Sequence, residues 1–400
     1  MAFGEANPIG EAVRQSPRID PKAPYDTASV AGKTILVTGG ASGFGAAFAR
    51  RWAALGAHLA IGDINDEAGE ALVAELRTTT PGGQHHHFVH CDVTSWESQA
   101  AFFKAAVEHS ADRCIHVVVP NAGIADSNTP LNQRGFENPA PFRDANGVVD
   151  EAQGPRAPHM PVADVNVTGV LYTTHLAMYW LPRNDGKDRH ILFLSSIAGL
   201  IPLPGQALYT MSKHAVTGLF RALRRTADVH NDLRVNMLCP YFVATPIMPS
   251  PAVAMLAGSG MATVADVVEA ATRFVADEAI AGRALVIGPK MLLRSLNGTA
   301  VGGEDDDNKS SNSAFDVIAS PADSIQVVGA PTAAQTAAGE DQAIWECYGE
   351  DFEVCETFVS RYMRLLNILT LTRGWAGFFW DLYNIYIKGR PAVPPKRKRA

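Results

Sequence analysis

Short runs of apolar, β-branched residues alternate with longer segments of helical character between Lys33 and about Pro289. The runs are nearly continuous rather than alternating in polarity, as strands covered on both faces require. Helices between such strands make right-handed crossovers, so the strands lie parallel in one sheet. The sequence therefore predicts an α/β fold of Rossmann type, with a doubly wound, seven-stranded parallel sheet. The seven runs are 33–40, 58–63, 87–93, 116–123, 190–196, 233–240 and 283–288.

Composition narrows the class of protein. The chain has 400 residues, of which 47% are hydrophobic and 19% charged, values typical of a globular protein. The net charge of -7 argues against nucleic acid as the main partner, because phosphate binding needs a concentrated basic surface. The five cysteines fit neither a disulfide framework nor a metal-binding CxxC pattern, and the first residues lack the apolar stretch of a secretory signal. We expect a cytoplasmic protein without a metal site.

Shifts in composition divide the chain into segments around the main domain. An insertion rich in Pro, Asn and Gly follows the fourth predicted strand and is longer than an ordinary connection. The predicted segments are a flexible lead-in at 1–32, the main α/β domain at 33–296 with its insertion at 126–161, a linker or mobile loop at 297–342, and a helical extension at 343–400.

The C-terminal extension is rich in leucine and aromatic residues and ends in a basic run, Lys396 to Arg399. Charged residues interrupt its apolar stretches, so it is a poor candidate to span a bilayer. Two interpretations stay open. The extension packs on its own or a partner subunit, or it lies on a membrane surface with the basic end near anionic lipid.

A glycine-rich loop links the first predicted strand to a strong helix-forming segment. Glycines allow a sharp turn and close approach of the backbone to a pyrophosphate, and the N-terminal end of the helix stabilises its negative charge. The loop is therefore predicted to bind a dinucleotide. Its candidate cofactor-binding residues are Gly39, Ser42, Gly43, Phe44 and Gly45.

Carboxylates at two strand ends extend the predicted cofactor site. Asp63 ends the second strand, where it can accept hydrogen bonds from the adenosine ribose hydroxyls and repel a 2′-phosphate. Ile64, rather than an arginine, follows it, so NAD is favoured over NADP. The alternative is that Asp63 caps the next helix. Asp92 and Val93 end the third strand and are candidates for the adenine pocket, although Asp92 is also suited to cap a turn.

A tyrosine, a lysine and a serine form the candidate catalytic group. Tyr209 and Lys213 are four residues apart, which places both on one face of a helix. A neighbouring cation favours the phenolate form, so Lys213 is predicted to lower the pKa of Tyr209. Ser196 ends the fifth strand, where α/β folds present ligand-binding residues.

Taken together, the motifs resemble the short-chain dehydrogenase/reductase family over about residues 33–290. They are T-G-x-x-x-G-x-G at 38–45, Asn121-Ala122-Gly123, Asn166, Ser196, Tyr209-x-x-x-Lys213 and Pro240. Within the family, the stretch beginning SSIAGLIPLPGQALYTMSK is most similar to the NAD-dependent 15-hydroxyprostaglandin dehydrogenase type and to fungal secondary-alcohol dehydrogenases.

The resemblance implies a role for each matched residue. Tyr209 is the catalytic acid and base, Lys213 lowers its pKa and binds the nicotinamide ribose, and Ser196 stabilises the reacting oxygen. Asn166 holds a water in the proton relay through its helix backbone. Ser196 is preferred to Ser195 because it has the family's spacing from the tyrosine. Residues implied to support the sheet or contact the cofactor are Asn121, Gly123, Pro240, Val243 and Thr245.

The substrate is predicted from the apolar residues near the catalytic group. Gln206 is a candidate to orient a substrate hydroxyl, and Tyr241 replaces the family's usual glycine near the nicotinamide entrance. The expected pocket walls are apolar, which suits a hydrophobic secondary alcohol or its ketone; the alternative is that they pack in the core. They are Ile197, Leu200, Leu203, Tyr241, Ile247 and Met248.

The predicted function is therefore NAD-dependent interconversion of a hydrophobic secondary alcohol and its ketone. Two alternatives remain, an NADPH-dependent ketoreductase and a nucleotide-binding scaffold without catalysis. By the resemblance, the protein is a homodimer or homotetramer that pairs through the helices carrying Asn166 and Tyr209.

Overall fold

The computed structural model describes residues 16–80, 82–126, 136–137, 139–144, 146–184, 188–248, 256, 260–295, 325–329, 341–348, 379–380 and 383. The chain divides into two compact units. The larger is Arg14–Cys347, and the smaller combines Met1–Val13 with Tyr348–Ala400. Most of the smaller unit, including the predicted helical extension beyond 348, lies outside the described residues. The account below concerns the larger unit.

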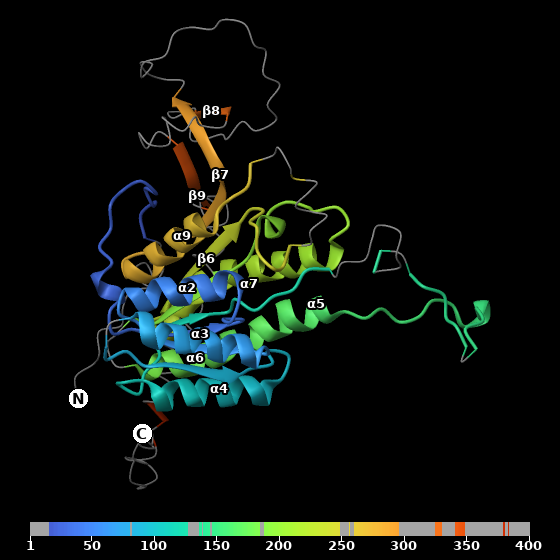
Figure 1. Ribbon diagram of the computed structural model, residues 1–400, viewed down its shortest axis with the longest axis horizontal. Coiled ribbons are helices and arrows are strands. Elements are labelled where there is room, and N and C mark those ends of the chain that lie inside the picture. The colour runs from blue at the N-terminus through green and yellow to red at the C-terminus, as the bar shows by residue number, and fades with distance from the viewer. Residues whose placement is uncertain are drawn as a thin grey trace, which may run out of the picture. The chain divides into compact units, whose positions relative to one another are not determined.

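The centre of the sheet has seven parallel strands in the order β3-β2-β1-β4-β5-β6-β7 (Figure 1). Strand order reverses between β1 and β4, which creates the crevice where doubly wound folds bind ligands. The predicted fold class is confirmed. The strands are β1 (Thr34–Thr38), β2 (His58–Asp63), β3 (His86–His90), β4 (Val117–Val119), β5 (His190–Leu194), β6 (Arg234–Pro240) and β7 (Ala284–Ser295).

Helices cover both faces of the sheet. One layer contains α3 (Asp66–Thr79), α2 (Gly43–Ala54) and α9 (Val264–Ala276), and the other contains α4 (Trp96–His109), α6 (Val170–Trp180) and α7 (Ala207–Asn231). Short helical turns are η1 (Ala28–Val30), η2 (Glu151–Gln153), α5 (Pro161–Ala163), the π-helix η3 (Asp164–Gly169), η4 (Leu181–Arg183) and η5 (Ile197–Gly199). Within the described part of the chain, no helix has the length and apolar character needed to cross a membrane.

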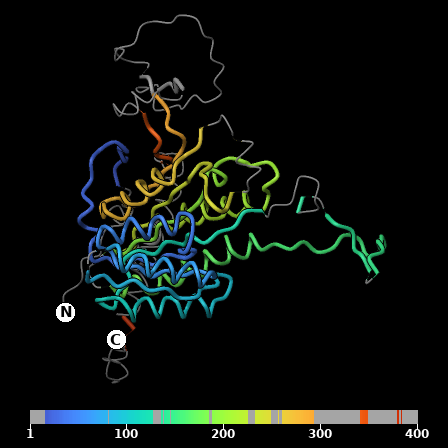
Figure 2. The backbone as a smooth tube through the Cα atoms, viewed as in Figure 1, coloured from blue at the N-terminus to red at the C-terminus, as the bar shows by residue number. Residues whose placement is uncertain are grey.

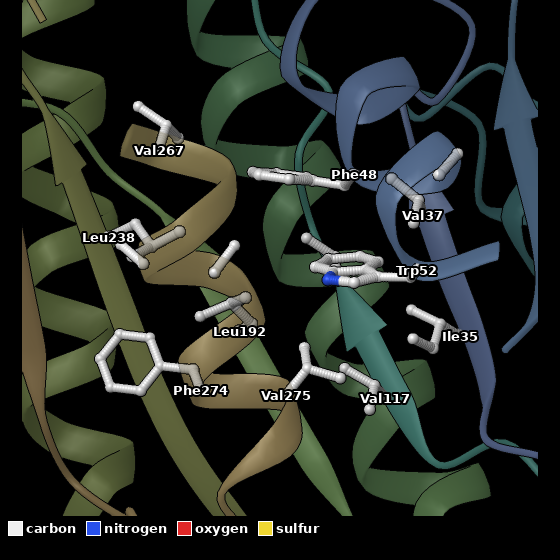
Figure 3. Close-up of a cluster of buried hydrophobic side chains, with 14 of the residues drawn as sticks. Ile35, Val37, Phe48, Trp52, Val117, Leu192, Leu238, Val267, Phe274 and Val275 are labelled. Atoms are coloured by element: carbon white, nitrogen blue, oxygen red, sulfur yellow. The ribbon is translucent and has the colours of Figure 1, made fainter. Parts of the chain in front are cut away.

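The main hydrophobic core lies between the sheet and the layer of α2 and α9 (Figure 3). Phe44, Phe48 and Trp52 are spaced by four residues and therefore share one face of α2. The Phe48 and Trp52 rings stack with centroids 5.0 Å apart, and Trp52 Nε1 donates to Thr272 Oγ1 of α9 over 3.1 Å. Phe274 of α9 is fully buried in the same cluster. This packing fixes the N-terminus of α2 beside the end of β1.

Two further strands make the sheet larger than predicted. β8 (Ile325–Gly329) and β9 (Asp341–Cys347) both pair antiparallel with β7. They lie in the segments predicted as a linker, 297–342, and as a helical extension from 343, so those predictions are wrong for 325–329 and 341–347. The physical reason is that β7 has a second edge, opposite β6, where β9 pairs with residues 284–287 and 291–292. It also continues to Ser295, beyond its pairing with β6, and there its backbone groups pair with β8.

Part of the predicted flexible lead-in is packed against the domain. The Arg273 guanidinium of α9 donates to the carbonyl oxygens of Pro21 (3.0 Å) and Ala23 (2.8 Å) and lies 4.4 Å from the Tyr25 ring centroid. Arg283, the residue before β7, donates to Ser16 O over 2.8 Å and pairs with Glu346 of β9 over 2.9 Å. The prediction of flexibility is therefore wrong for residues 16–32. Residues 1–15 lie outside the described residues.

The described part of the insertion folds back on itself. Isolated antiparallel bridges join Pro141 to Pro155 and Arg143 to Val149, and Phe142 N donates to Gly154 O over 3.0 Å. In Figures 1 and 2 this hairpin runs away from both helical layers before the chain returns through α5 and η3. The insertion thus begins at the end of β4 and ends at the helix that carries Asn166.

Buried histidines in β3 predict that the fold loses stability in acid. Burial lowers the pKa values of His86 and His87 to about 4. Each unfolded histidine binds a proton below pH ~6.5, so stability is complete above that pH and falls as pH decreases toward 4. Neither ring nitrogen of His87 has a hydrogen-bond partner in the described part of the chain, and its ring stacks on His109 with centroids 4.8 Å apart.

We expect His87→Phe to keep the stacking and remove the proton-linked loss. The free energy of unfolding of this variant should exceed that of the natural protein by an amount that grows by about 1–3 kcal/mol as pH falls from about 6.5 to about 4. The difference between the two melting temperatures should widen over the same range. Differential scanning calorimetry over that range measures it, with His175→Phe on the exposed side of α6 as the control. A constant difference at every pH would contradict the assignment.

Candidate active site

The loop between β1 and α2 has room only for glycine at two positions. Gly39 has a φ of +62°, and a Cβ added there would lie 2.6 Å from Ala122 Cα. A Cβ on Gly45 would lie 2.4 Å from Gly39 O. Gly43 has a φ of +51° and begins α2, and Ser42 is its N-cap residue, without a side-chain bond to the helix. The loop is therefore drawn tightly against the end of β4.

The start of α2 presents backbone rather than side chains. In an α-helix the first N–H groups, here those of Gly43, Phe44 and Gly45, have no partner within the helix. The Phe44 ring packs against the core and leaves these groups uncovered. Free N–H groups at the positive end of a helix fit the pyrophosphate of a dinucleotide. The residues of the loop thus suit the cofactor predicted for it.

Asp63 is held at the end of β2 by backbone donors. Its Oδ2 accepts from Ala41 N of the glycine loop and its Oδ1 from Asn65 N, both over 3.0 Å. The N-cap of α3 is Asn65, whose side chain accepts from Ala68 N. The alternative that Asp63 caps the next helix is therefore wrong. Its carboxylate lies beside the glycine loop, as a residue that recognises the adenosine ribose requires.

Asp92 and Val93 follow β3. Asp92 Oδ1 accepts from Thr94 N (2.9 Å) and from Thr94 Oγ1 (2.8 Å), so its carboxylate caps a turn, the alternative left open by the sequence. Val93 is buried and lies against Gly169 of η3, where a Cβ would approach the valine side chain to 2.9 Å.

Asn121 ties the ends of β1 and β4 together. Its Nδ2 donates to Thr38 O (2.9 Å) and Gly39 O (2.8 Å). Gly123 follows, and a Cβ added there would lie 3.4 Å from Asn166 Oδ1 and 3.7 Å from Lys213 Nζ. The Asn-Ala-Gly segment therefore connects the glycine loop to the predicted catalytic residues.

Ser196, Tyr209 and Lys213 come together at the carboxyl ends of β5 and β6. Lys213 Nζ lies 5.6 Å from the Tyr209 ring centroid and donates to Leu194 O over 3.1 Å. Ser196 Oγ accepts from Ala198 N over 3.1 Å. Ser195 points instead to α7, where its hydroxyl donates to Lys213 O over 3.1 Å. The two serines therefore differ in their surroundings: Ser196 lies beside Tyr209, and Ser195 bonds the backbone of α7.

Burial dominates the titration of this group. It raises the pKa of Tyr209, and a hydrogen bond with Ser196 opposes the shift. Burial also lowers the pKa of Lys213 to about 8, against an opposing effect of Cys239. The sequence predicted that Lys213 would lower the pKa of Tyr209, and the structure differs because the lysine is itself buried and its ammonium is directed to a backbone carbonyl.

Asn166 lies in the π-helix η3, a rare backbone form that is frequent at functional sites. Its Oδ1 accepts from Ile124 N (2.9 Å), and its Nδ2 donates to Ile124 O (2.8 Å) and Ser212 Oγ (3.0 Å). These bonds occupy the side-chain amide, so the backbone of η3 is the part available to a proton relay, as the family resemblance implies.

The chain at and after the end of β6 passes close to both Ser196, the predicted catalytic serine, and the glycine loop. Ser196 Oγ lies 3.5 Å from Pro240 O. Val243 is buried and forms a parallel bridge with Ala262. Pro246 Cδ lies 3.9 Å from the position of a Cβ on Gly43. The segment therefore borders the loop expected to hold the cofactor.

The remaining predicted contacts lie on the rim of this region. The Tyr241 ring packs edge-on against Phe242 with centroids 4.8 Å apart. Thr245 O accepts from Met248 N over 3.0 Å, and Gln206 O accepts from Thr210 N over 2.8 Å in the first turn of α7. The structure assigns no ligand contact to any of these three positions, so their roles stay predictions.

Two residues of the site were missed from the sequence, and a third, Thr38, was recognised only as part of the glycine-loop motif. Thr38 Oγ1 accepts from Asn121 N over 3.1 Å. Asp126 Oδ2 accepts from Tyr209 N over 3.2 Å, and Ser212 Oγ donates to Tyr209 O over 2.8 Å. Ser212 directly precedes Lys213 of the tyrosine motif, and this position could have indicated a role in the site. Asp126 begins an irregular insertion, and no motif in the sequence indicates that it contacts Tyr209.

Comparison with known proteins identifies the family. The sequence profile of the family described as short chain dehydrogenase matches residues 33–252, more than half of the chain. The chain belongs to the short-chain dehydrogenase family. It is thus an NAD(P)-dependent oxidoreductase that acts on CH–OH groups, and the Rossmann-type fold and the enzyme class predicted from the sequence are confirmed.

Three relatives of this dehydrogenase bear on its substrate and cofactor. 5'-hydroxyaverantin dehydrogenase of Dothistroma septosporum is 36% identical over 285 residues, covering 66% of this chain and 87% of the relative. NADP-dependent dehydrogenase M3 of a Phoma species is 30% identical, covering 65% and 76%. The NAD+-linked 15-hydroxyprostaglandin dehydrogenase of Bos taurus is 31% identical, covering 55% and 72%.

Proposed function

We propose that this dehydrogenase uses NAD to oxidise a hydrophobic secondary alcohol to its ketone. The observation that carries the proposal is the exposure of the predicted pocket walls. All six are at least partly accessible, and although Tyr241 packs against the main core cluster, the other five lie outside it, so the alternative that they form core is not supported for those five. Relatives named as hydroxyaverantin and hydroxyprostaglandin dehydrogenases support a secondary alcohol as the substrate. The walls are Ile197, Leu200, Leu203, Tyr241, Ile247 and Met248.

In the proposed reaction the chain moves one proton. The Tyr209 phenolate accepts the proton of the substrate hydroxyl, while the Ser196 hydroxyl donates a hydrogen bond to the substrate oxygen. Burial raises the pKa of Tyr209, so the phenolate is the minor form before substrate binds, and the hydrogen bond with Ser196 is the interaction that favours it. Lys213 supplies positive charge beside the phenol, and the backbone of η3 at Asn166 holds the water through which the proton leaves. When bound, the nicotinamide dinucleotide supplies the hydride acceptor. The residues proposed to hold it are those of the glycine loop, Asp63, Asn121, Gly123, Lys213 and the segment 240–245.

A panel of alcohols tests the substrate class. Purified full-length protein is mixed with NAD and secondary alcohols of increasing apolar surface, together with small polyols, and NADH absorbance is followed. Each additional buried methylene should raise kcat/KM by about threefold to fourfold until the pocket is filled, since its burial contributes about 0.8 kcal/mol. Activity confined to the polyols would refute the proposed substrate class.

The preference for NAD rests on the carboxylate of Asp63. A 2′-phosphate near it would be repelled, and the adjacent Ile64 is 66% exposed and offers no positive charge. The NADP-dependent relative supports a second candidate function, that of an NADPH-dependent ketoreductase. The preserved tyrosine and lysine argue against the third, a scaffold without catalysis.

A binding titration separates the two cofactors. We expect the Kd for NADP to exceed that for NAD by at least about tenfold, the effect of about 1.4 kcal/mol. Ile64→Arg should narrow this ratio by pairing with the 2′-phosphate, and the uncharged control Ile64→Gln should not. Isothermal titration calorimetry measures the Kd values for NAD and NADP with the natural protein and both variants. Tighter binding of NADP by the natural protein would favour the ketoreductase.

The oligomeric state and the membrane contact stay predictions. Leu171 and Tyr179 of α6 and Met211 of α7 are exposed on the helices through which family members are expected to pair, which supports a homodimer or homotetramer. The extension assigned to membrane contact lies almost wholly outside the described residues.

A further inference from the structure

The peptide groups of Tyr209 are held from both sides. Its N–H donates to Asp126 Oδ2 over 3.2 Å, and its carbonyl oxygen accepts from Ser212 Oγ over 2.8 Å. Ser212 Oγ in turn accepts from Asn166 Nδ2 over 3.0 Å. The proposed acid-base residue is thus anchored by its backbone to two other segments of the chain.

These bonds close into a ring. The Asn166 amide also bonds both the N–H (2.9 Å) and the carbonyl (2.8 Å) of Ile124, which lies in the same short segment after β4 as Asp126. The ring therefore runs from Ile124 through Asn166, Ser212 and Tyr209 to Asp126 and back along the chain. It joins both ends of the insertion, at Asp126 and before Asn166, to the start of α7.

The ring contains one charged acceptor at a favourable place. Tyr209 lies in the first turn of α7, where N–H groups lack partners within the helix and a negative charge is stabilised. A carboxylate makes a stronger bond to such a donor than a neutral group does. Asn166 and Ser212 are almost completely buried, so their bonds are shielded from water. Asp126 is only partly buried and is the one acidic member.

We propose that Asp126 is a positioning residue for Tyr209, linking the beginning of the insertion to the placement of the phenol. The inference rests on the proposed function, because positioning has a catalytic effect only if Tyr209 transfers the proton. Loss of the bond frees the first turn of α7 and misplaces the phenol, while the cofactor loop is untouched. A misplacement of about 1 Å costs on the order of 10²-fold in rate.

Three variants test the link. Asp126→Ala removes the acceptor, Asp126→Asn keeps an acceptor oxygen without the charge, and Asp144→Ala is the control. The Asp144 carboxylate lies in the same insertion, where it accepts only from the nearby Asn146 N and Val148 N among the described residues. We expect Asp126→Ala to lower kcat by about 10- to 100-fold with the Kd for NAD unchanged. Asp126→Asn should restore most of the rate, and Asp144→Ala should match the natural protein.

Hydrogen exchange followed by mass spectrometry gives a readout that does not depend on turnover. Peptides that cover 207–211 should exchange faster in Asp126→Ala than in the natural protein or in Asp144→Ala. Unchanged exchange, or faster exchange with unchanged kcat, would overturn the proposal. If the natural protein oxidises no alcohol, the proposed function is wrong, and so is the catalytic part of this inference. The hydrogen-exchange measurement still decides whether Asp126 anchors the first turn of α7.

Discussion

Replacement of Tyr209 by phenylalanine is expected to lower kcat by about 10²- to 10⁴-fold, the usual contribution of a positioned acid-base group. Phenylalanine keeps the ring that packs beside Lys213 and removes only the phenol oxygen that is proposed to accept the substrate proton. The cofactor loop and Asp63 are untouched, so the Kd for NAD should stay within about twofold. Steady-state rates and a calorimetric NAD titration on the same preparation measure both quantities.

The control for Tyr209→Phe is Tyr179→Phe, which removes a hydroxyl from an exposed tyrosine on α6. It should leave both kcat and NAD affinity unchanged. Turnover of Tyr209→Phe at the natural rate would show that another group takes the proton. A parallel loss of NAD binding would instead mean that the tyrosine supports the cofactor site and not the chemistry alone.

The largest effect on stability is expected from Asp188→Ala. The Asp188 carboxylate accepts from Lys33 Nζ (2.8 Å) and from Arg234 Nε (2.5 Å), and its side chain is only 2% exposed. Burial alone would raise the pKa of the Asp188 carboxyl, but the Arg234 guanidinium holds this pKa well below its usual range. Removal of the carboxylate leaves the buried Arg234 without this partner and Lys33 with only the half-exposed Glu278 at 2.7 Å, and breaking such a buried pair costs about 3–5 kcal/mol. Urea-induced unfolding at neutral pH measures the change.

A surface ion pair gives the matched comparison for Asp188. Arg50 and Glu75 form a pair at 2.7 Å between side chains that are about half exposed. Glu75→Ala should lower stability by less than about 1 kcal/mol, because water screens the pair. Equal losses in Asp188→Ala and Glu75→Ala would contradict the role assigned to burial. The Asp188 cluster lies at the amino ends of β5 and β6, so folded Asp188→Ala should retain its NAD affinity.

The central fold and the close placement of Tyr209 and Lys213 could be predicted from the sequence because their signals are local. A strand covered on both faces is a continuous apolar run, and Tyr209 and Lys213 share a face through their spacing in one helix. The strands β8 and β9 could not be predicted in this way. Their pairing depends on where β7 ends, and β9 reaches it only after a long stretch of acidic and small residues.

Contacts between distant segments account for the other differences. The lead-in looks flexible by composition, but it is held by Arg273, whose hydrogen bonds to Pro21 and Ala23 span about 250 residues of sequence. The anchoring of Tyr209 by Asp126 likewise joins an irregular segment to a helix. Burial of Lys213, which sets its pKa, also depends on the complete packing and not on neighbours in sequence.

The connections made by Arg283 also determine when the domain can finish folding. Arg283 directly precedes β7 and is bonded to Ser16 near the start of the described chain and to Glu346 in β9. During synthesis β7 emerges from the ribosome before β9, with its outer backbone groups unpaired for the time needed to make the intervening segment. Such an edge invites association with other nascent chains. Completion of the sheet is therefore a late event of synthesis, and until then the outer edge of β7 is open to association.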